Sequence, residues 1–265
     1  MEYDGTTAEK FVELVNMIDT SSWKELPEQF QKLLYISKSK MGLYNSCPFA
    51  FKLSYIDKVK VETPIYFTIG IEVHNFIEQF FKTISFDADG DLVLPQYNIE
   101  ENKAYKKNVI KFEIDRWKVC IKSKTDEAKK YFMPLHNEES ITVENPKLTG
   151  IVDRVHLSFK NEVVVVENKT GKPTPQKNKD YYIDLLWYKL LLEMKFGYKI
   201  SKGSLYYPYN NYVCRVRLYD TDADGLLKKI DVIREKIRTA QFEPKPSRSN
   251  CNNCRFKLPC PHRVR

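Results

Sequence analysis

The spacing of apolar positions along the chain changes near residue 140. Before that point, apolar residues recur every three to four positions, which predicts amphipathic helices. From Ile141 onward, short runs rich in valine, isoleucine and tyrosine predict strands, with helices between some of them. The resulting order is helices, a β meander, a helix, two strands and a final helix. That order predicts an α/β fold with a mixed central sheet flanked by helices.

The element boundaries follow from the same pattern. The predicted helices are Thr7–Ile18, Pro27–Leu34, Lys40–Tyr55, Phe67–Thr83, Glu101–Lys122, Asp126–Phe132, Asn178–Phe196 and Asp222–Thr239. The predicted strands are Ile141–Glu144, Lys147–Phe159, Glu162–Asn168, Gly203–Tyr207 and Tyr212–Tyr219. Ser39 is the expected N-cap of the third helix, and Gly197 ends the seventh. The unbroken Val163–Val166 run predicts a central strand that is buried on both faces.

Composition and charge narrow the class of protein. The chain has 43 Lys and Arg residues and 35 acidic residues, which gives a net charge of +8. A basic surface favours the binding of polyanions. The alternative is a soluble protein whose basic surface binds no polyanion. No apolar run approaches the roughly 20 residues that cross a membrane, and the acidic start does not resemble a signal peptide. We therefore expect a cytoplasmic protein with no membrane partner. Six cysteines in a reducing compartment indicate a metal or reactive site rather than disulfides.

Two carboxylates and a lysine stand at neighbouring strand ends. Asp153 lies on one predicted strand, and Glu167 and Lys169 end the next, two residues apart and so on one face. Carboxylate oxygens are ligands for Mg²⁺ or Mn²⁺, which polarise a phosphate and activate water. Lys169 could orient that water or offset developing negative charge. An E-x-K pair alone is common, and the alternative is a strand that ends in ordinary surface charges.

The sequence around these residues is similar to a known family. Gly150-x-x-Asp153 and Glu167-x-Lys169-Thr170-Gly171 resemble the central motifs of the RecB-like branch of PD-(D/E)XK nucleases, which includes CRISPR-associated exonucleases. The resemblance implies a restriction-endonuclease-like core and DNA cleavage with Mg²⁺ or Mn²⁺. Asp153, Glu167 and Lys169 are then the expected catalytic residues, with the two acids as metal ligands.

Two further motifs extend the resemblance. Gly70-x-x-x-His74 is similar to the family's first motif, whose histidine ligates metal. An imidazole ligand favours Mn²⁺ over Mg²⁺. The alternative is that His74 is an ordinary packed residue of a helix. Gly70 lies one turn from His74, so the small residue could leave room beside the imidazole. Asp184 and Tyr188 resemble the family's Q-L-x-x-Y motif, which supports the active site and the DNA. Asp184 replaces the usual Gln and cannot donate amide hydrogen bonds, although it could add a metal contact, and core packing is the alternative role for Tyr188.

The tail carries a cysteine run. Cys251, Cys254 and Cys260 have the spacing of a metal clip that needs a fourth ligand. Cys47 lies in Tyr44–Phe51, which resembles the family's N-terminal y-x-x-C-P-x-x-f signature. The resemblance implies that Cys47 and the three late cysteines bind a [4Fe–4S] cluster that staples the helical region to the C-terminal region. Spacing alone leaves a zinc site open.

Together these patterns predict a metal-dependent DNA exonuclease that acts on single strands or ends, within residues 39–265. Residues 1–38 are expected to be a helical extension without an assigned function. One alternative is a CRISPR adaptation nuclease that trims DNA before integration, in antiviral defence rather than DNA repair. Another is a catalytically silent iron–sulfur protein that binds DNA. The sequence contains no G-x-x-x-x-G-K-[ST] motor motif, so a helicase or integrase partner would be a separate protein.

Overall fold

The computed structural model describes residues 28–62, 65–97 and 103–264. The chain divides into two compact units. The first combines Met1–Pro64, Val143–Thr149 and Asp224–Arg265, and the second combines Ile65–Thr142 and Gly150–Ala223. Among the described residues, no helix has the length and apolar character that a membrane span requires.

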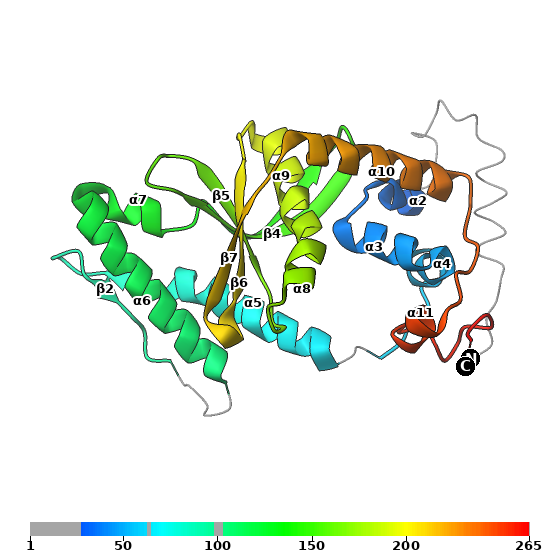
Figure 1. Ribbon diagram of the computed structural model, residues 1–265, viewed down its shortest axis with the longest axis horizontal. Coiled ribbons are helices and arrows are strands. Elements are labelled where there is room, and N and C mark those ends of the chain that lie inside the picture. Colours follow the sequence, from blue (N-terminus) through cyan, green and yellow to red (C-terminus); the bar gives the residue numbers. More distant parts are fainter. Residues whose placement is uncertain (1–27, 63–64, 98–102, 265) are drawn as a thin grey trace. The chain divides into compact units, whose positions relative to one another are not determined.

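The helices and strands form a mixed α/β fold (Figure 1). The helices are α2 Glu28–Leu34, α3 Lys38–Ser46, α4 Pro48–Tyr55, α5 Ile65–Thr83, α6 Ala104–Lys124, α7 Ala128–Phe132, α8 Pro175–Asp180, α9 Tyr182–Phe196, α10 Asp220–Arg238 and α11 Arg248–Asn252. The strands are β1 Ser85–Phe86, β2 Leu92–Val93, β3 His136–Val143, β4 Leu148–Leu157, β5 Val163–Asn168, β6 Lys202–Tyr207 and β7 Tyr212–Arg217.

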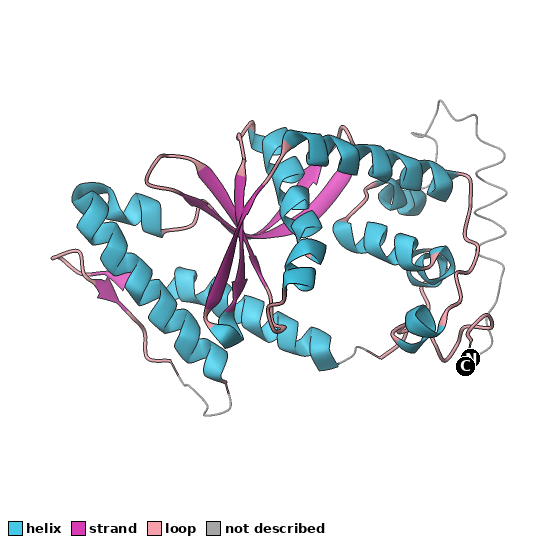
Figure 2. Cartoon of the chain, viewed as in Figure 1, coloured by secondary structure: helices cyan, strands magenta, loops and turns pink. Residues whose placement is uncertain are grey.

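Five of the strands form one mixed sheet in the order β3-β4-β5-β6-β7 (Figure 2). Strand β5 pairs antiparallel with β4 and parallel with β6, and β6 pairs antiparallel with β7. The parallel step from β5 to β6 is made through α8 and α9, as a crossover between parallel strands requires. The predicted mixed sheet flanked by helices is therefore confirmed, and β5 is its central strand.

Helices cover both faces of this sheet. On one face, a Cβ atom at Gly150 would lie 2.9 Å from the Leu191 side chain and 3.1 Å from Trp187 Nε1, so only glycine lets α9 approach β4 this closely. On the other face, the ring of Phe112 in α6 stacks on Tyr206 with centroids 4.6 Å apart. The glycine of the Gly150-x-x-Asp153 motif thus has a packing role.

The structure corrects two helices. The predicted Lys40–Tyr55 helix is broken into α3 and α4, because Cys47 is extended (φ −160°, ψ 109°) and Pro48 disfavours a helical residue before it. The N-cap of α3 is Ser37, not Ser39, and the Ser37 side chain accepts a hydrogen bond from the Lys40 N–H. The predicted Asn178–Phe196 helix is likewise two helices that meet at Tyr181.

Some strands were also predicted imperfectly. Strand β3 begins at His136, five residues before the predicted start at Ile141. The short β1–β2 hairpin was not predicted. The predicted helix Thr7–Ile18 lies outside the described residues, as do Pro27 and the first two residues of the predicted Glu101–Lys122 helix.

The first unit has a small core of its own. Phe49, Ala50 and Leu53 of α4 pack against Phe256 from the C-terminal segment. Phe51 of the same helix stacks on Phe242, with centroids 6.2 Å apart. These contacts join two segments that are about 200 positions apart in the sequence.

Candidate metal-dependent active site

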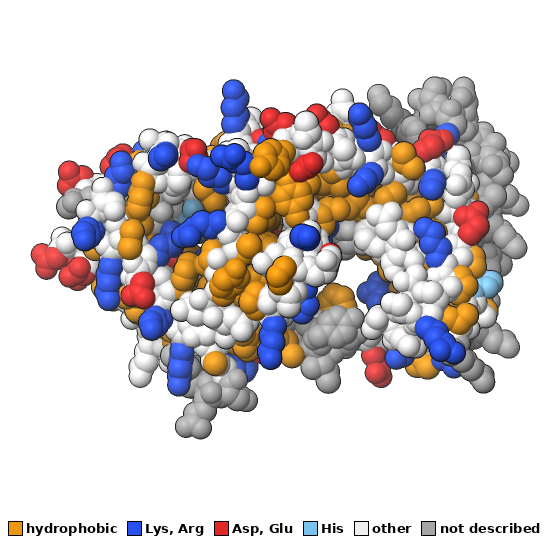
Figure 3. Space-filling model, in the orientation of Figure 1, with side chains coloured by type: hydrophobic (Ala, Val, Ile, Leu, Met, Phe, Trp, Pro, Cys, Tyr) orange, Lys and Arg blue, Asp and Glu red, His pale blue; other side chains and the backbone are white. Residues whose placement is uncertain are grey.

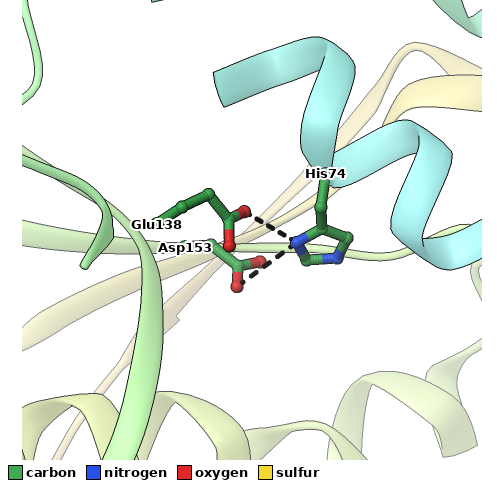
Figure 4. A group of neighbouring side chains, drawn as sticks. All are labelled: His74, Glu138 and Asp153. Carbon is green, nitrogen blue, oxygen red and sulfur yellow. Dashed lines mark hydrogen bonds and ion pairs between the residues drawn. The ribbon is translucent and has the colours of Figure 1, made fainter. Parts of the chain in front are cut away.

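Three side chains that could ligate a metal converge in the second unit (Figure 4). His74 extends from α5, Glu138 from β3 and Asp153 from β4. The His74 Nδ1 atom lies 2.8 Å from Glu138 Oε1 and 3.5 Å from Asp153 Oδ1. One ligand atom from each residue lies within 4.8 Å of the others, so a single cation could contact all three.

The backbone at Glu138 has an unusual conformation. Its φ of 49° is left-handed, which is uncommon for a residue other than glycine and is costly inside a strand. The neighbouring Asn137 side chain donates a hydrogen bond to the carbonyl of Glu78, 3.2 Å away on α5. This irregular start of β3 aims the Glu138 carboxylate at His74, as Figure 4 shows.

Asp153 is buried and held from two sides. Its Oδ2 atom accepts the N–H of Asn168 at 2.7 Å, and its Oδ1 atom accepts the Tyr188 hydroxyl at 2.6 Å. Tyr188 lies on α9 and is itself buried, and burial and the nearby Asp153 carboxylate raise the pKa of its phenol well above the usual value. Tyr188 therefore stays a hydrogen-bond donor and fixes the orientation of the Asp153 carboxylate.

Glu167 and Lys169 lie beside this group at the end of β5. The Lys169 ammonium forms ion pairs with Glu167 and with Asp184 of α9, the latter at 2.5 Å. Glu167 is buried, and its Oε2 atom has no hydrogen-bond partner among the described residues. The ammonium also lies over the ring of Tyr181, 4.2 Å from its centroid. Lys169 is thus fixed by two carboxylates and an aromatic face.

The charges of the site shift the pKa values of its cations upward. Burial alone would lower the pKa of His74, but the carboxylates of Asp153 and Glu138 outweigh it and raise that pKa to about 9. Burial alone would likewise lower the pKa of Lys169, but Glu167 and Asp184 raise it above its ordinary value. Both shifts have one cause, an excess of carboxylates in a place with little water.

The residues fit a divalent cation. The site holds four carboxylates but one lysine ammonium and one imidazole, so its negative charges outnumber its positive charges. The buried Glu167 Oε2, which has no hydrogen-bond partner in the described part of the chain, is the kind of acceptor that a metal or its bound water would satisfy. Hard carboxylate oxygens with one imidazole nitrogen suit Mn²⁺ or Mg²⁺.

A buried ionic network lies on the opposite side of β4 and β5. The Arg154 guanidinium donates to Glu113 Oε1 at 2.7 Å and to Asn168 Oδ1 at 3.1 Å. Glu113 also pairs with Arg116 at 2.6 Å, and these two guanidinium groups hold its pKa low despite burial. Because Asn168 donates its N–H to Asp153, this network supports the backbone that orients the site.

Most of the predicted active-site residues lie close to one another in the structure. The structure brings together His74, Asp153, Glu167, Lys169, Asp184 and Tyr188. Asp184 pairs with Lys169 and does not belong to the group of candidate metal ligands, which is His74, Glu138 and Asp153. A Cβ atom at Gly70 would meet nothing within 4 Å, so the suggestion that Gly70 makes room for His74 is wrong. Glu138 was missed, because its polar stretch shows no strand periodicity.

The predicted cluster cysteines all lie in the first unit, whereas Cys120 and Cys214 lie in the second. Cys47, Cys254 and Cys260 pack against the aromatic core around Phe256. Burial raises the pKa of the Cys254 thiol, and the neighbouring thiols of Cys47, Cys251 and Cys260 raise it further. Among the described residues, the sulfurs of these cysteines do not form a group of three or more ligand atoms within 4.8 Å of one another, so the predicted cluster stays a prediction.

Comparison with known proteins assigns the family. The model of the PD-(D/E)XK nuclease superfamily matches residues 35–261. Among solved structures, the chain is similar to one described as "Crystal structure of SSO0001", with 13% identity, a TM-score of 0.38, and coverage of 98% of this chain and 96% of that chain. A search of curated proteins gives no match. The family match spans most of the chain and includes every residue of the site, so this protein belongs to the PD-(D/E)XK nuclease superfamily.

Proposed function

We propose that this protein is a metal-dependent DNA nuclease that hydrolyses phosphodiester bonds, as an exonuclease on single strands or DNA ends. The observation that carries the proposal is the convergence of His74, Glu138 and Asp153 beside the fixed Lys169 ammonium. Superfamily membership supports the nuclease chemistry. The net positive charge supports a polyanionic substrate.

Each side chain has a role that follows from its position. A bound Mn²⁺ or Mg²⁺ would supply Lewis acidity toward the scissile phosphate and lower the pKa of an attacking water. Asp153, Glu138 and Glu167 would offer carboxylate oxygens to it. His74 would offer Nδ1, and it must first lose the proton that the free site favours.

The remaining residues position these ligands and the substrate. Tyr188 holds the Asp153 carboxylate in one orientation through its hydroxyl. Lys169 stays an ammonium group, so it stabilises negative charge that develops on the phosphate rather than accepting a proton. Asp184 takes part by holding Lys169.

A cleavage assay tests this proposal. Labelled single-stranded, blunt and overhanging DNA are each incubated with the protein in Mn²⁺, in Mg²⁺ and in excess chelator. The proposal predicts products that shorten progressively from an end, in either metal and not in chelator. Cleavage that persists in chelator, or no cleavage of any substrate in either metal, would contradict it. Trimming of DNA before CRISPR integration, with an integrase or helicase partner, would use the same residues.

We also propose that Cys47, Cys251, Cys254 and Cys260 bind a [4Fe–4S] cluster. The support is the resemblance of the cysteine motifs to the iron–sulfur members of the family, and the packing of Cys47, Cys254 and Cys260 against one core that joins α4 to the C-terminal segment. Burial raises the pKa values of the Cys254 and Cys260 thiols, so a bound cation would displace their protons. Four thiolates also fit zinc, and metal analysis separates the two.

A further inference from the structure

Helix α6 carries an unbalanced charge on its exposed side. Its inward side is formed by the buried residues Tyr105, Val109, Glu113, Trp117 and Cys120. The helix contains seven basic residues and two acids, and one of those acids, Glu113, is buried against arginines. Its exposed side is therefore a row of lysines with Asp115 as the one exposed acid on the helix.

The lysines of this row share one narrow face. Lys107, Lys111, Lys118 and Lys122 follow spacings of four, seven and four residues, which places them within about 60° around the helix axis. Figure 3 shows a row of basic side chains along the diagonal line of α6. A shallow hollow of about 430 Å³ lies on this face, and its lining residues are Lys107, Ile110, Lys111, Ile114, Asp115 and Lys118.

An ordinary solvated helix has a different pattern. In α10, acids alternate with bases and form local pairs such as Asp231 with Arg234 and Glu235 with Arg238. On α6, by contrast, Lys107 and Lys111 form no ion pair with a described residue, and Lys118 has one long contact, 3.8 Å to Asp115. Lysines four apart repel each other and destabilise a helix, and a bound polyanion relieves that repulsion.

The row of lysines starts beside the helix that carries His74. Lys103, which directly precedes α6, pairs with Glu72 at 3.1 Å, and Glu72 is two residues before His74 on α5. Phe76 of α5 also contacts Tyr105 of α6, with ring centroids 5.8 Å apart. The lysine face therefore extends away from the α5 segment that holds a proposed metal ligand.

We propose that the exposed face of α6, defined by Lys107, Lys111, Lys118 and Lys122, binds the phosphate backbone of the DNA strand whose end is cleaved. The lysines contact successive phosphates, and Ile110 and Ile114 give the hollow an apolar floor for sugars. The contacts are to the backbone, so this face contributes affinity without sequence preference. The identity of the polyanion rests on the proposed nuclease function.

Binding in excess chelator tests the α6 face separately from cleavage. The anisotropy of a labelled single strand of about 30 nucleotides is titrated with the wild-type protein at several salt concentrations. The test variant is K107E/K111E/K118E. The control is K228E/K229E/K236E, which makes the same change in net charge on exposed positions of α10. A second test variant, K107A/K111A/K118A, is expected to keep the helix intact because alanine favours it.

The proposal predicts that both α6 variants bind at least tenfold more weakly and that the slope of log K against log salt falls by about 2, since each lost phosphate contact contributes about 0.7. The α10 control should stay within threefold of the wild type. Hydrolysis of thymidine 5′-p-nitrophenyl phosphate, which is too short to reach α6, should be unchanged in all three variants.

Two results would overturn the α6 proposal. One is wild-type affinity and salt slope in the alanine variant. The other is an equal loss in the α10 control, which would show that net charge alone matters. A protein that binds DNA through α6 but cleaves neither DNA nor the small ester would instead contradict the proposed nuclease function, so the two failures are distinguishable.

Discussion

The Lys169 ammonium lies 2.5 Å from the Asp184 carboxylate, and the carboxylate is buried while the lysine side chain is 12% exposed. This pair links the end of β5 to the first turn of α9, and it explains why an acid can stand where the family usually has glutamine. A glutamine would offer Lys169 one neutral carbonyl, whereas Asp184 offers a charge. We therefore propose that Asp184 positions Lys169, the lysine that we propose is catalytic.

Substitutions at Asp184 test this role. Asp184→Leu should lower kcat about 100-fold with little change in KM, because Lys169 loses an anchor that substrate binding does not use. Asp184→Gln should restore much of the activity, since its carbonyl can still accept from Lys169. The Mn²⁺ concentration that gives half-maximal rate should stay the same in both variants. If that concentration rises tenfold or more, Asp184 is a metal ligand and the positioning role is wrong.

Glu138 should contribute to metal affinity. Glu138→Gln removes a charge while it keeps the size of the side chain, so Mn²⁺ binding measured calorimetrically on the metal-free protein should weaken about tenfold. Glu139→Gln is the matched control, because Glu139 is the adjacent residue and pairs with His136 instead. Equal Mn²⁺ affinity in the wild type and Glu138→Gln would show that Glu138 is no ligand.

The network behind the sheet should matter for stability. Glu113→Gln leaves the buried Arg154 guanidinium without its charge partner, so the free energy of unfolding should fall by about 3 kcal/mol. The control is Glu127→Gln, which removes an exposed pair with Lys130 and should cost less than about 0.5 kcal/mol. Urea denaturation measures both values. Similar losses in the two variants would contradict a structural role for the buried pair.

The proposed cluster predicts that anaerobically purified protein is brown and holds about four irons per chain. Serine at Cys47, Cys251, Cys254 or Cys260 should lower both the iron content and the thermal stability, because the cluster joins α4 to the tail. Cys120→Ser and Cys214→Ser should leave the iron content unchanged. One zinc and no iron would replace the cluster with a zinc site, and iron loss from Cys120→Ser alone would show that Cys47 is not the fourth ligand.

Local sequence patterns predicted the elements whose signals are contiguous. The valine run of β5 and the carboxylates of adjacent strands are such signals, because neighbouring strands place Asp153 and Glu167 close together without further information. The sequence also contains a signal for the helix break at Cys47, since a residue before proline avoids the helical region of backbone conformation. The apolar spacing on both sides of Cys47 is helical, and it led to the prediction of one continuous helix.

Other parts of the site depend on tertiary packing. Glu138 reaches His74 because Glu138 itself has a left-handed backbone conformation near the start of β3. The residues around it are polar, so they show no alternation of apolar and polar positions that would predict a strand. The Lys169–Asp184 pair depends on how closely α9 packs on the sheet, which Gly150 permits and no local rule specifies. The partition of residues 1–38 from 39–265 stays a prediction.

We propose that one site, built around Asp153, Glu167 and Lys169, hydrolyses DNA. The most direct measurement is the single-turnover rate of cleavage of an end-labelled single strand in Mn²⁺, for the wild type and for Glu167→Gln, with strand binding measured in parallel. We predict that Glu167→Gln lowers the rate at least 1000-fold while the Kd for the strand changes less than threefold, because the carboxylate serves the metal and not the DNA backbone. A Glu167→Gln protein that cleaves at the wild-type rate would show that this site does not hydrolyse DNA.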